Sequence, residues 1–313
     1  MDVHQGDRAE FVTSLMEQVS LPRNQIAAQS GLSNTYIRDL EQGRILNVGR
    51  EKLIAFGVAT NISLQKMDEL LEVFDRARLS ESDIPHFVDT AQRKRFTSAL
   101  LPVKDDFTLG LAMLASELKP GPHVVVSSEP TVCLRLEGHR LYTQRHLVES
   151  HPIYGPLVET IGRERFQALV ANLGSHPVDN YLCRSCLEDY IRTCAEPQER
   201  AWRVKHLQNV AWFIQNSPRW NLFLTNACPT FSFTLKQGQQ GGKQPNRLII
   251  TRQPPHRFQG PRSGKLAGFV TSNEVMVEHF KSELGSLQPS ILDEYRDRER
   301  LVDYLRDLAL RGR

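Results

Sequence analysis

Three cysteines in one short segment have the spacing that comes nearest to a metal site. Cys183 and Cys186 are separated by two residues, as in many zinc and iron–sulfur sites, and Cys194 follows eight residues later. The same three residues also lie on one apolar helical stripe, where cysteine behaves as a small buried hydrophobe. The apolar stripe favours burial of these three cysteines in the core, and a metal or redox site is the alternative. We expect no cofactor. Cys133 and Cys228 lie in strand-like sequence and are expected in the core.

A long run of positive charge is the second chemical feature. Between Arg200 and Asn273 the sequence has eleven Lys and Arg residues and no Asp or Glu. Guanidinium groups match the geometry of phosphate and carboxylate, so arginines gathered at strand ends and Gly-rich loops predict a site for a small anionic effector. The candidates are Arg247, Arg252, Arg257 and Arg262. Two alternatives stay open: solvated cations paired with acids of the last helices, or a second contact with a DNA backbone.

The sequence lacks the common catalytic motifs that would indicate an enzyme. The sequence contains no GxSxG elbow, no phosphate-binding GxxxxGK[ST] loop, no GxGxxG after a strand and no HExxH zinc motif. Its ten histidines are scattered and form no recurring acid–base pattern. We therefore expect a binding protein.

Residues 23–44 have the pattern of two helices joined by a tight turn. Ala27 is small enough for two helices to cross closely, and Gly31 can adopt the positive φ of the turn. Ser33 stands where an N-cap belongs, and Gly43 stands where the second helix should end. The apolar contacts between the two helices would come from Ile26, Leu32, Ile37 and Leu40.

This segment resembles the helix-turn-helix of the phage-repressor-like, or xenobiotic-response-element, family of transcriptional regulators. The similarity rests on Ile-Ala-x-x-x-Gly-Leu-Ser and Ile-x-x-Leu-Glu-Gln-Gly-Arg, and it covers roughly residues 7–75. It implies a five-helix domain that places its third helix in the DNA major groove, usually as a dimer. The residues that it implies for contact with double-stranded DNA are Arg23, Ser33, Asn34, Thr35, Tyr36, Arg38 and Arg44.

Arg38 departs from the family, which often has Ser at this position. A guanidinium there would either fork onto guanine or bind a phosphate. Charge is modest in this part of the chain: residues 1–100 have 12 Lys and Arg against 14 Asp and Glu. Because DNA affinity comes largely from phosphate neutralisation, a weakly charged reader would need to dimerise.

The 313 residues are enough for about two domains, and the 40% hydrophobic content predicts packed cores. Residues 1–78 read as all-α and 79–86 as a linker. Residues 87–289 read as an α/β domain for effector sensing or dimerisation, and 290–313 as a helix with a possible dimer contact. Helices are expected at about 154–172, 178–194, 199–216 and 273–284, and strands at about 123–127, 221–225, 230–235, 248–251 and 266–271.

The sequence begins with polar residues and has no apolar run near the ~20 residues that span a bilayer, so we expect a cytoplasmic protein without a membrane partner. Together these features predict a sequence-specific regulator of transcription that binds an operator as a homodimer. A protein–protein adaptor, such as an antitoxin-like component, is the alternative. A nucleic-acid-processing enzyme is the third possibility.

Overall fold

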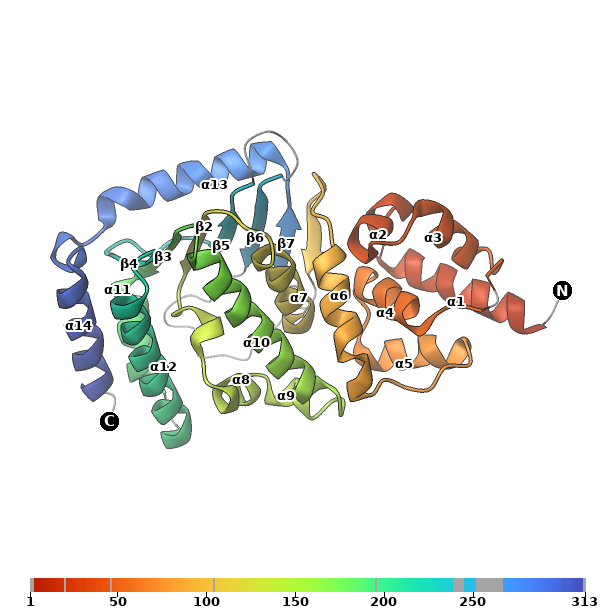
Figure 1. Ribbon diagram of the computed structural model, residues 1–313, viewed down its shortest axis with the longest axis horizontal. Coiled ribbons are helices and arrows are strands. Elements are labelled where there is room, and N and C mark those ends of the chain that lie inside the picture. The colour runs from red at the N-terminus through yellow and green to blue at the C-terminus, as the bar shows by residue number, and fades with distance from the viewer. Residues whose placement is uncertain are drawn as a thin grey trace.

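The computed structural model describes residues 3–19, 21–45, 47–103, 105–194, 196–238, 245–251 and 267–311. Within them a helical N-terminal region is followed by an α/β region, as predicted (Figure 1). Among the described helices none is both long and apolar enough to cross a membrane.

Five helices form the N-terminal region. They are α1 (Val3–Val19), α2 (Arg23–Ser30), α3 (Asn34–Glu41), α4 (Arg50–Ala59) and α5 (Leu64–Val73). Side-chain caps start two of them: Ser33 Oγ accepts from Tyr36 N at 3.1 Å, and Ser63 Oγ accepts from Lys66 N at 3.2 Å. Ile37 and Leu40 lie on the apolar face of α3 and are buried in the core of this region.

The turn between α2 and α3 has the predicted chemistry. Gly31 lies in the left-handed region with φ +72°, and its N–H donates to Ala27 O at 3.0 Å, which ends α2. Gly43, with φ +65°, follows the end of α3. The expectations for Gly31, Ser33 and Gly43 are confirmed, because each depends only on neighbours three or four residues away.

A mixed sheet is the centre of the α/β region, and its strand order in the described residues is β1-β7-β6-β5-β2-β3-β4. Strands β2, β3 and β4 are parallel, and the other neighbours pair antiparallel. The strands are β1 (Leu101–Val103), β2 (His123–Ser127), β3 (Val178–Cys183), β4 (Trp220–Thr225), β5 (Ser232–Lys236), β6 (Arg247–Thr251) and β7 (Gly268–Thr271).

Helices cover both faces of this sheet. Ile249 of β6 faces the cluster that contains α7 and α10, whereas Leu248 and Ile250 on the opposite face pack with α13. The helices here are α6 (Ile84–Arg93), α7 (Asp106–Glu117), α8 (Glu137–Thr143), α9 (Arg145–Val148), α10 (Tyr154–Leu173), α11 (Arg184–Arg192), α12 (Pro197–Asn216), α13 (Glu274–Leu287) and α14 (Arg298–Arg311).

Two predicted elements are wrong in their limits. The helix expected at 178–194 is strand β3 up to Cys183 and helix α11 only from Arg184. Pairing with β2 on one side and β4 on the other overrides the helical periodicity of this segment. The last α-helix begins at Arg298 rather than near residue 290, and its apolar face packs against α12 of the same chain.

The two regions share a continuous hydrophobic cluster, in which Leu53 of α4, Phe87 of α6 and Leu111 of α7 are fully buried. Helix α6 lies between the N-terminal helices and α7 (Figure 1). The segment 79–86, predicted as a linker, contains a 3₁₀ turn, Glu81–Asp83, and the first residues of α6. Helix α2 is therefore supported by packing against α6.

Candidate nucleic-acid interface

Helix α3 presents a polar face to solvent. Asn34, Thr35 and Arg38 are exposed, as is Gln42 just after the helix, and the spacing of these residues puts them on one side. The opposite side is buried through Ile37 and Leu40. A short helix with one buried stripe and one polar exposed face is suited to entering a groove while its other side stays packed.

The exposed face of α3 adjoins the beginning of α2. A surface hollow of about 340 Å³ is lined by Arg23, Asn24, Asn34, Thr35 and Arg38. It brings together the N-terminal ends of two helices, whose first backbone N–H groups have no partner inside the helix. Such ends favour anions because the unpaired N–H groups and the helix dipole act in the same direction. Four of the predicted DNA-contact residues thus line one hollow.

Acidic neighbours reduce the positive charge of this face. Arg23 at the start of α2 forms an ion pair with Glu41 at the end of α3. Asp39 lies 3.4 Å from Arg38 Nε and 3.5 Å from Arg44 Nη1. Three guanidinium groups therefore share two carboxylates, which leaves a small positive excess.

Two of the predicted contact residues have structural partners. The Ser33 hydroxyl caps α3, and the half-buried Tyr36 ring has Lys52 Nζ 4.8 Å from its centroid. Burial, with a smaller effect from the Glu51 charge, raises the pKa of Tyr36 above its ordinary value. Tyr36 is therefore a neutral phenol of α3 whose ring lies beside Lys52 of α4.

Of the predicted anion site, only Arg247 lies within the described residues. Arg252, Arg257 and Arg262 lie outside them, so the structure does not test whether the four converge. Arg247 begins β6, is buried, and has its guanidinium 5.8 Å from the centroid of the Phe96 ring. Burial lowers its pKa below the ordinary value.

Lys236, which the sequence analysis did not select as a site residue, pairs with Arg247 across β5 and β6. It is 1% exposed, and its Nζ has no hydrogen-bond partner among the described residues. Burial lowers its pKa to about 8. From sequence alone, a lysine at the end of a strand is predicted to lie on the surface. Only the fold shows that Lys236 is buried.

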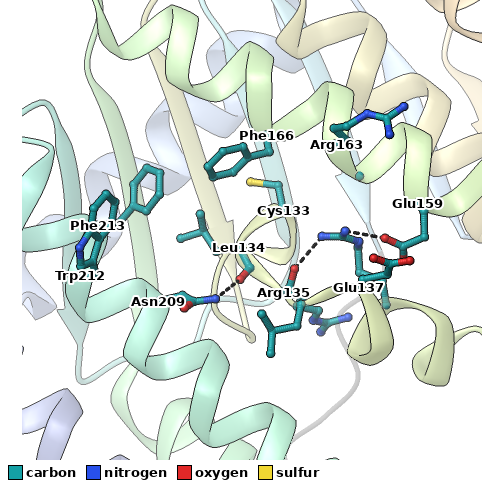
Figure 2. Close-up of a pocket in the computed structure, with 13 residues that line it drawn as sticks. Cys133, Leu134, Arg135, Glu137, Glu159, Arg163, Phe166, Asn209, Trp212 and Phe213 are labelled. Carbon is teal, nitrogen blue, oxygen red and sulfur yellow. Dashed lines mark hydrogen bonds and ion pairs between the residues drawn. The ribbon is translucent and has the colours of Figure 1, made fainter.

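A larger hollow lies in the α/β region, and Arg247 is not among its lining residues (Figure 2). It has a volume of about 550 Å³ and is enclosed by residues 133–137 and by α8, α10 and α12. Its lining combines Arg135, Arg140 and Arg163 with the aromatic rings of Phe166 and Trp212. Arg140 forms an ion pair with Glu159 at 2.6 Å. No local sequence motif marks this hollow, because its residues come from separate helices.

The cysteines are arranged differently from the predicted set. The thiols of Cys183, Cys186 and Cys228 form one group. Cys194 lies apart, at the end of α11, where its Sγ donates to Glu196 O at 3.4 Å. The expectation that Cys228 is a core residue is wrong, because it lies exposed in the loop after β4.

No known protein family, curated protein or solved structure matches this chain. The interpretation of the α2–α3 face and of the two other sites therefore depends on their geometry and chemistry.

Proposed function

We propose that this protein is a sequence-specific DNA-binding regulator of transcription, which binds an operator as a dimer through α2 and α3. The observation that carries the proposal is the hollow in which Arg23, Asn24, Asn34, Thr35 and Arg38 meet at the N-terminal ends of two helices. Helix N-termini bind phosphate, and side chains at the start of an exposed helix reach base edges in the major groove. One surface thus supplies both kinds of contact.

Different residues would serve positioning and sequence selection. Arg23 and the first N–H groups of α2 would bind a backbone phosphate, which fixes the register without reading sequence. Asn34, Thr35 and Arg38 project from α3 and would contact base edges. A guanidinium that forks onto guanine discriminates against other bases by about 1–3 kcal/mol.

We expect dimerisation because the α2–α3 face of each copy has only a small net positive charge. Since Asp39 and Glu41 pair with the arginines of this face, one copy would neutralise few phosphates and bind weakly. Two copies on half-sites about 34 Å apart would add their contacts. An inverted-repeat operator is therefore expected.

The effector would bind in the 550 Å³ hollow of the α/β region. Arg135 and Arg140 pair with Glu129 and Glu159, so Arg163 and the aromatic rings are the groups that suit a small anion with an apolar or aromatic body. Arg163, Phe166 and Trp212 are the exposed members among these arginines and aromatic rings. They are the side chains best placed to meet an entering ligand.

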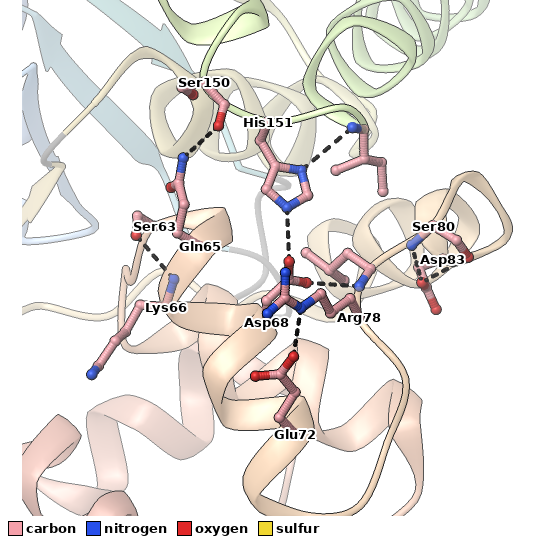
Figure 3. Close-up of polar contacts among 12 residues, drawn as sticks. Ser63, Gln65, Lys66, Asp68, Glu72, Arg78, Ser80, Asp83, Ser150 and His151 are labelled. Atoms are coloured by element: carbon pink, nitrogen blue, oxygen red, sulfur yellow. Dashed lines mark hydrogen bonds and ion pairs between the residues drawn. The ribbon is translucent and has the colours of Figure 1, made fainter.

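Polar contacts join α5 to residues 150 and 151, in the segment before α10 (Figure 3). Gln65 Nε2 of α5 donates to Ser150 O at 2.8 Å, and His151 Nε2 lies 3.1 Å from Asp68 Oδ2 of the same helix. Residues 150 and 151 lie in the segment that leads into α10, which begins at Tyr154 and lines the hollow with Glu159, Gly162, Arg163 and Phe166. A ligand that shifts α10 would therefore act on α5. Coupling requires that it bind two arrangements of this contact with different affinity.

Selection of DNA from a random pool by the purified chain tests the DNA reader. The wild type should enrich one inverted repeat. Arg38→Ala should relax selection at one base pair of each half-site, and Arg23→Ala should weaken all sequences alike. Arg192→Ala, an exposed arginine of α11, is the matched control and should change neither. No enrichment by the wild type would contradict the proposal and favour a protein–protein adaptor.

Binding of the fluorescent sulfonate anilinonaphthalenesulfonate tests the hollow. Arg163→Ala and Trp212→Ala should each weaken binding of this aromatic anion, while Lys281→Ala on the opposite side of the sheet should not. Because coupling is reciprocal, a ligand that changes DNA affinity must have its own affinity changed by DNA. His151→Gln should reduce that coupling and leave separate binding of each ligand intact. Equal affinity for the probe in the wild type and all variants would contradict an effector site in this hollow.

A further inference from the structure

We propose that Cys183, Cys186 and Cys228 form a binding site for a thiophilic metal ion, with Zn²⁺ as the reference ion. Their three Sγ atoms all lie within 4.8 Å of one another, and those of Cys186 and Cys228 are 3.7 Å apart. The site is separate from the α2–α3 face and from the α10 hollow, so it does not rest on the proposed DNA binding.

The fold builds this group from two adjacent parallel strands. Cys183 is the last residue of β3, and α11 begins at the next residue, which places Cys186 in the first helical turn. Strand β4 lies beside β3 and ends at Thr225, so the loop that carries Cys228 leaves the same edge of the sheet. The carboxyl edge of parallel strands is where α/β sheets gather their ligand-binding groups.

The loop after β4 is held by its own contacts. Thr225 Oγ1 donates to Ala227 O at 2.8 Å, and Asn226 N donates to Ser290 O at 2.8 Å. Thr225 also forms an isolated β-bridge with Ile291. These contacts hold the residues just before Cys228, and in this loop conformation its thiol already lies beside the other two.

The spacing fits a tetrahedral thiolate site. Zn–S bonds of about 2.3 Å at tetrahedral angles put two sulfurs about 3.8 Å apart, close to the observed 3.7 Å. The other two sulfur–sulfur distances are at most 4.8 Å, so they exceed the tetrahedral value by about 1 Å at most. Rotation of the cysteine side chains can close this difference. Cys183 and Cys186 are buried while Cys228 is exposed, which leaves the fourth coordination position towards solvent. Three protein ligands and one open position define a site that exchanges its metal or binds an external ligand.

Three thiols gathered in one group suit a soft metal ion. Such an ion displaces the thiol protons on binding, and thiolates prefer zinc and similarly soft ions.

Cobalt substitution tests the site directly. The reduced, chelator-stripped full-length chain is titrated with Co²⁺, which gives an intense sulfur-to-metal charge-transfer band when thiolates bind it. Saturation at one ion per chain is expected, and Zn²⁺ should bleach the band. Competition with a coloured zinc chelator then supplies the affinity.

Matched cysteine variants identify the ligands. Cys228→Ser changes an exposed residue, so the chain should fold, and it should lower metal affinity at least about tenfold, since removing even an outer-shell partner has that effect. Cys194→Ser, whose hydroxyl can keep the bond to Glu196 O, should leave affinity unchanged. The inference is overturned if no charge-transfer band forms, if both variants bind metal equally well, or if the isolated chain instead contains a Cys186–Cys228 disulfide and binds no zinc.

Discussion

Arg23 and Glu41 join the two ends of the helix-turn-helix, because Arg23 Nε at the start of α2 donates to Glu41 Oε2 at the end of α3 at 3.1 Å. The pair joins α2 to α3 and also neutralises a cation on the face proposed to meet DNA. Its two effects can be separated by removing only the charge of the carboxylate.

Glu41→Gln should increase affinity for non-specific DNA and steepen its salt dependence. The amide oxygen can still accept from Arg23, while the guanidinium charge becomes available to a phosphate. The slope of log K against log salt should change by about −0.9 for each added phosphate contact. Glu69→Gln, which changes an exposed residue of α5, is the control and should have no effect on DNA affinity or its salt dependence. An unchanged slope for Glu41→Gln would show that Arg23 does not contact DNA.

Gly31→Ala should destabilise the chain by about 1–2 kcal/mol. The residue has φ +72°, and an added Cβ would lie 2.9 Å from Cβ of Arg93 on α6, so the turn and α6 would have to separate. Gly285→Ala is the matched control, since its added Cβ meets nothing within 4 Å and alanine favours a helix interior. Urea unfolding of both variants measures the difference, and equal midpoints would contradict the strain at Gly31.

Asp83→Asn should lower the free energy of unfolding by about 3 kcal/mol at neutral pH, because it leaves Arg50 without its buried partner. Burial alone would raise the pKa of Asp83, but hydrogen bonds from Arg50 and Ser80 lower it overall. A depressed pKa in the folded state stabilises the protein above the unfolded pKa, and that stability is lost as the pH falls through the folded value.

The difference between wild type and Asp83→Asn should therefore shrink in acid. Urea titrations at neutral pH and near pH 3 measure it, with the exposed Asp75→Asn as a control that stays within about 0.5 kcal/mol. A difference that is the same at both pH values would argue against the ion pair.

Lys236→Met should stabilise the chain at neutral pH by about 3 kcal/mol. Burial lowers the lysine's pKa to about 8 in the folded state, so below pH 8 the folded chain must hold a buried charge. Wild-type stability should rise between about pH 8 and pH 10.5 as the folded lysine loses its proton first, and the variant should lack this rise. Lys281→Met on α13 is the exposed control. A destabilised Lys236→Met would show that the charge has a partner.

The local features of α2 and α3 could be predicted from sequence. Gly31, Ser33 and Gly43 act on backbone groups within four residues, so their types and spacing identify a turn, a cap and a helix end without knowledge of the rest of the chain. Strand β2 was also predictable at its observed limits, because a short β-branched run between turn residues has few alternatives.

The sites of the α/β region were decided only by the tertiary structure. The C-x-x-C spacing pointed to Cys194 as the third thiol, but β3 pairs with β4 and brings Cys228 from 42 residues away, as the separation from Cys186 shows. The hollow beside α10 and the burial of Lys236 likewise depend on how distant elements pack. Sequence by itself determined which residues cap α3 and form the turn between α2 and α3, since those interactions are local. Which side chains meet across the sheet was determined by strand order, which hydrophobic periodicity does not encode.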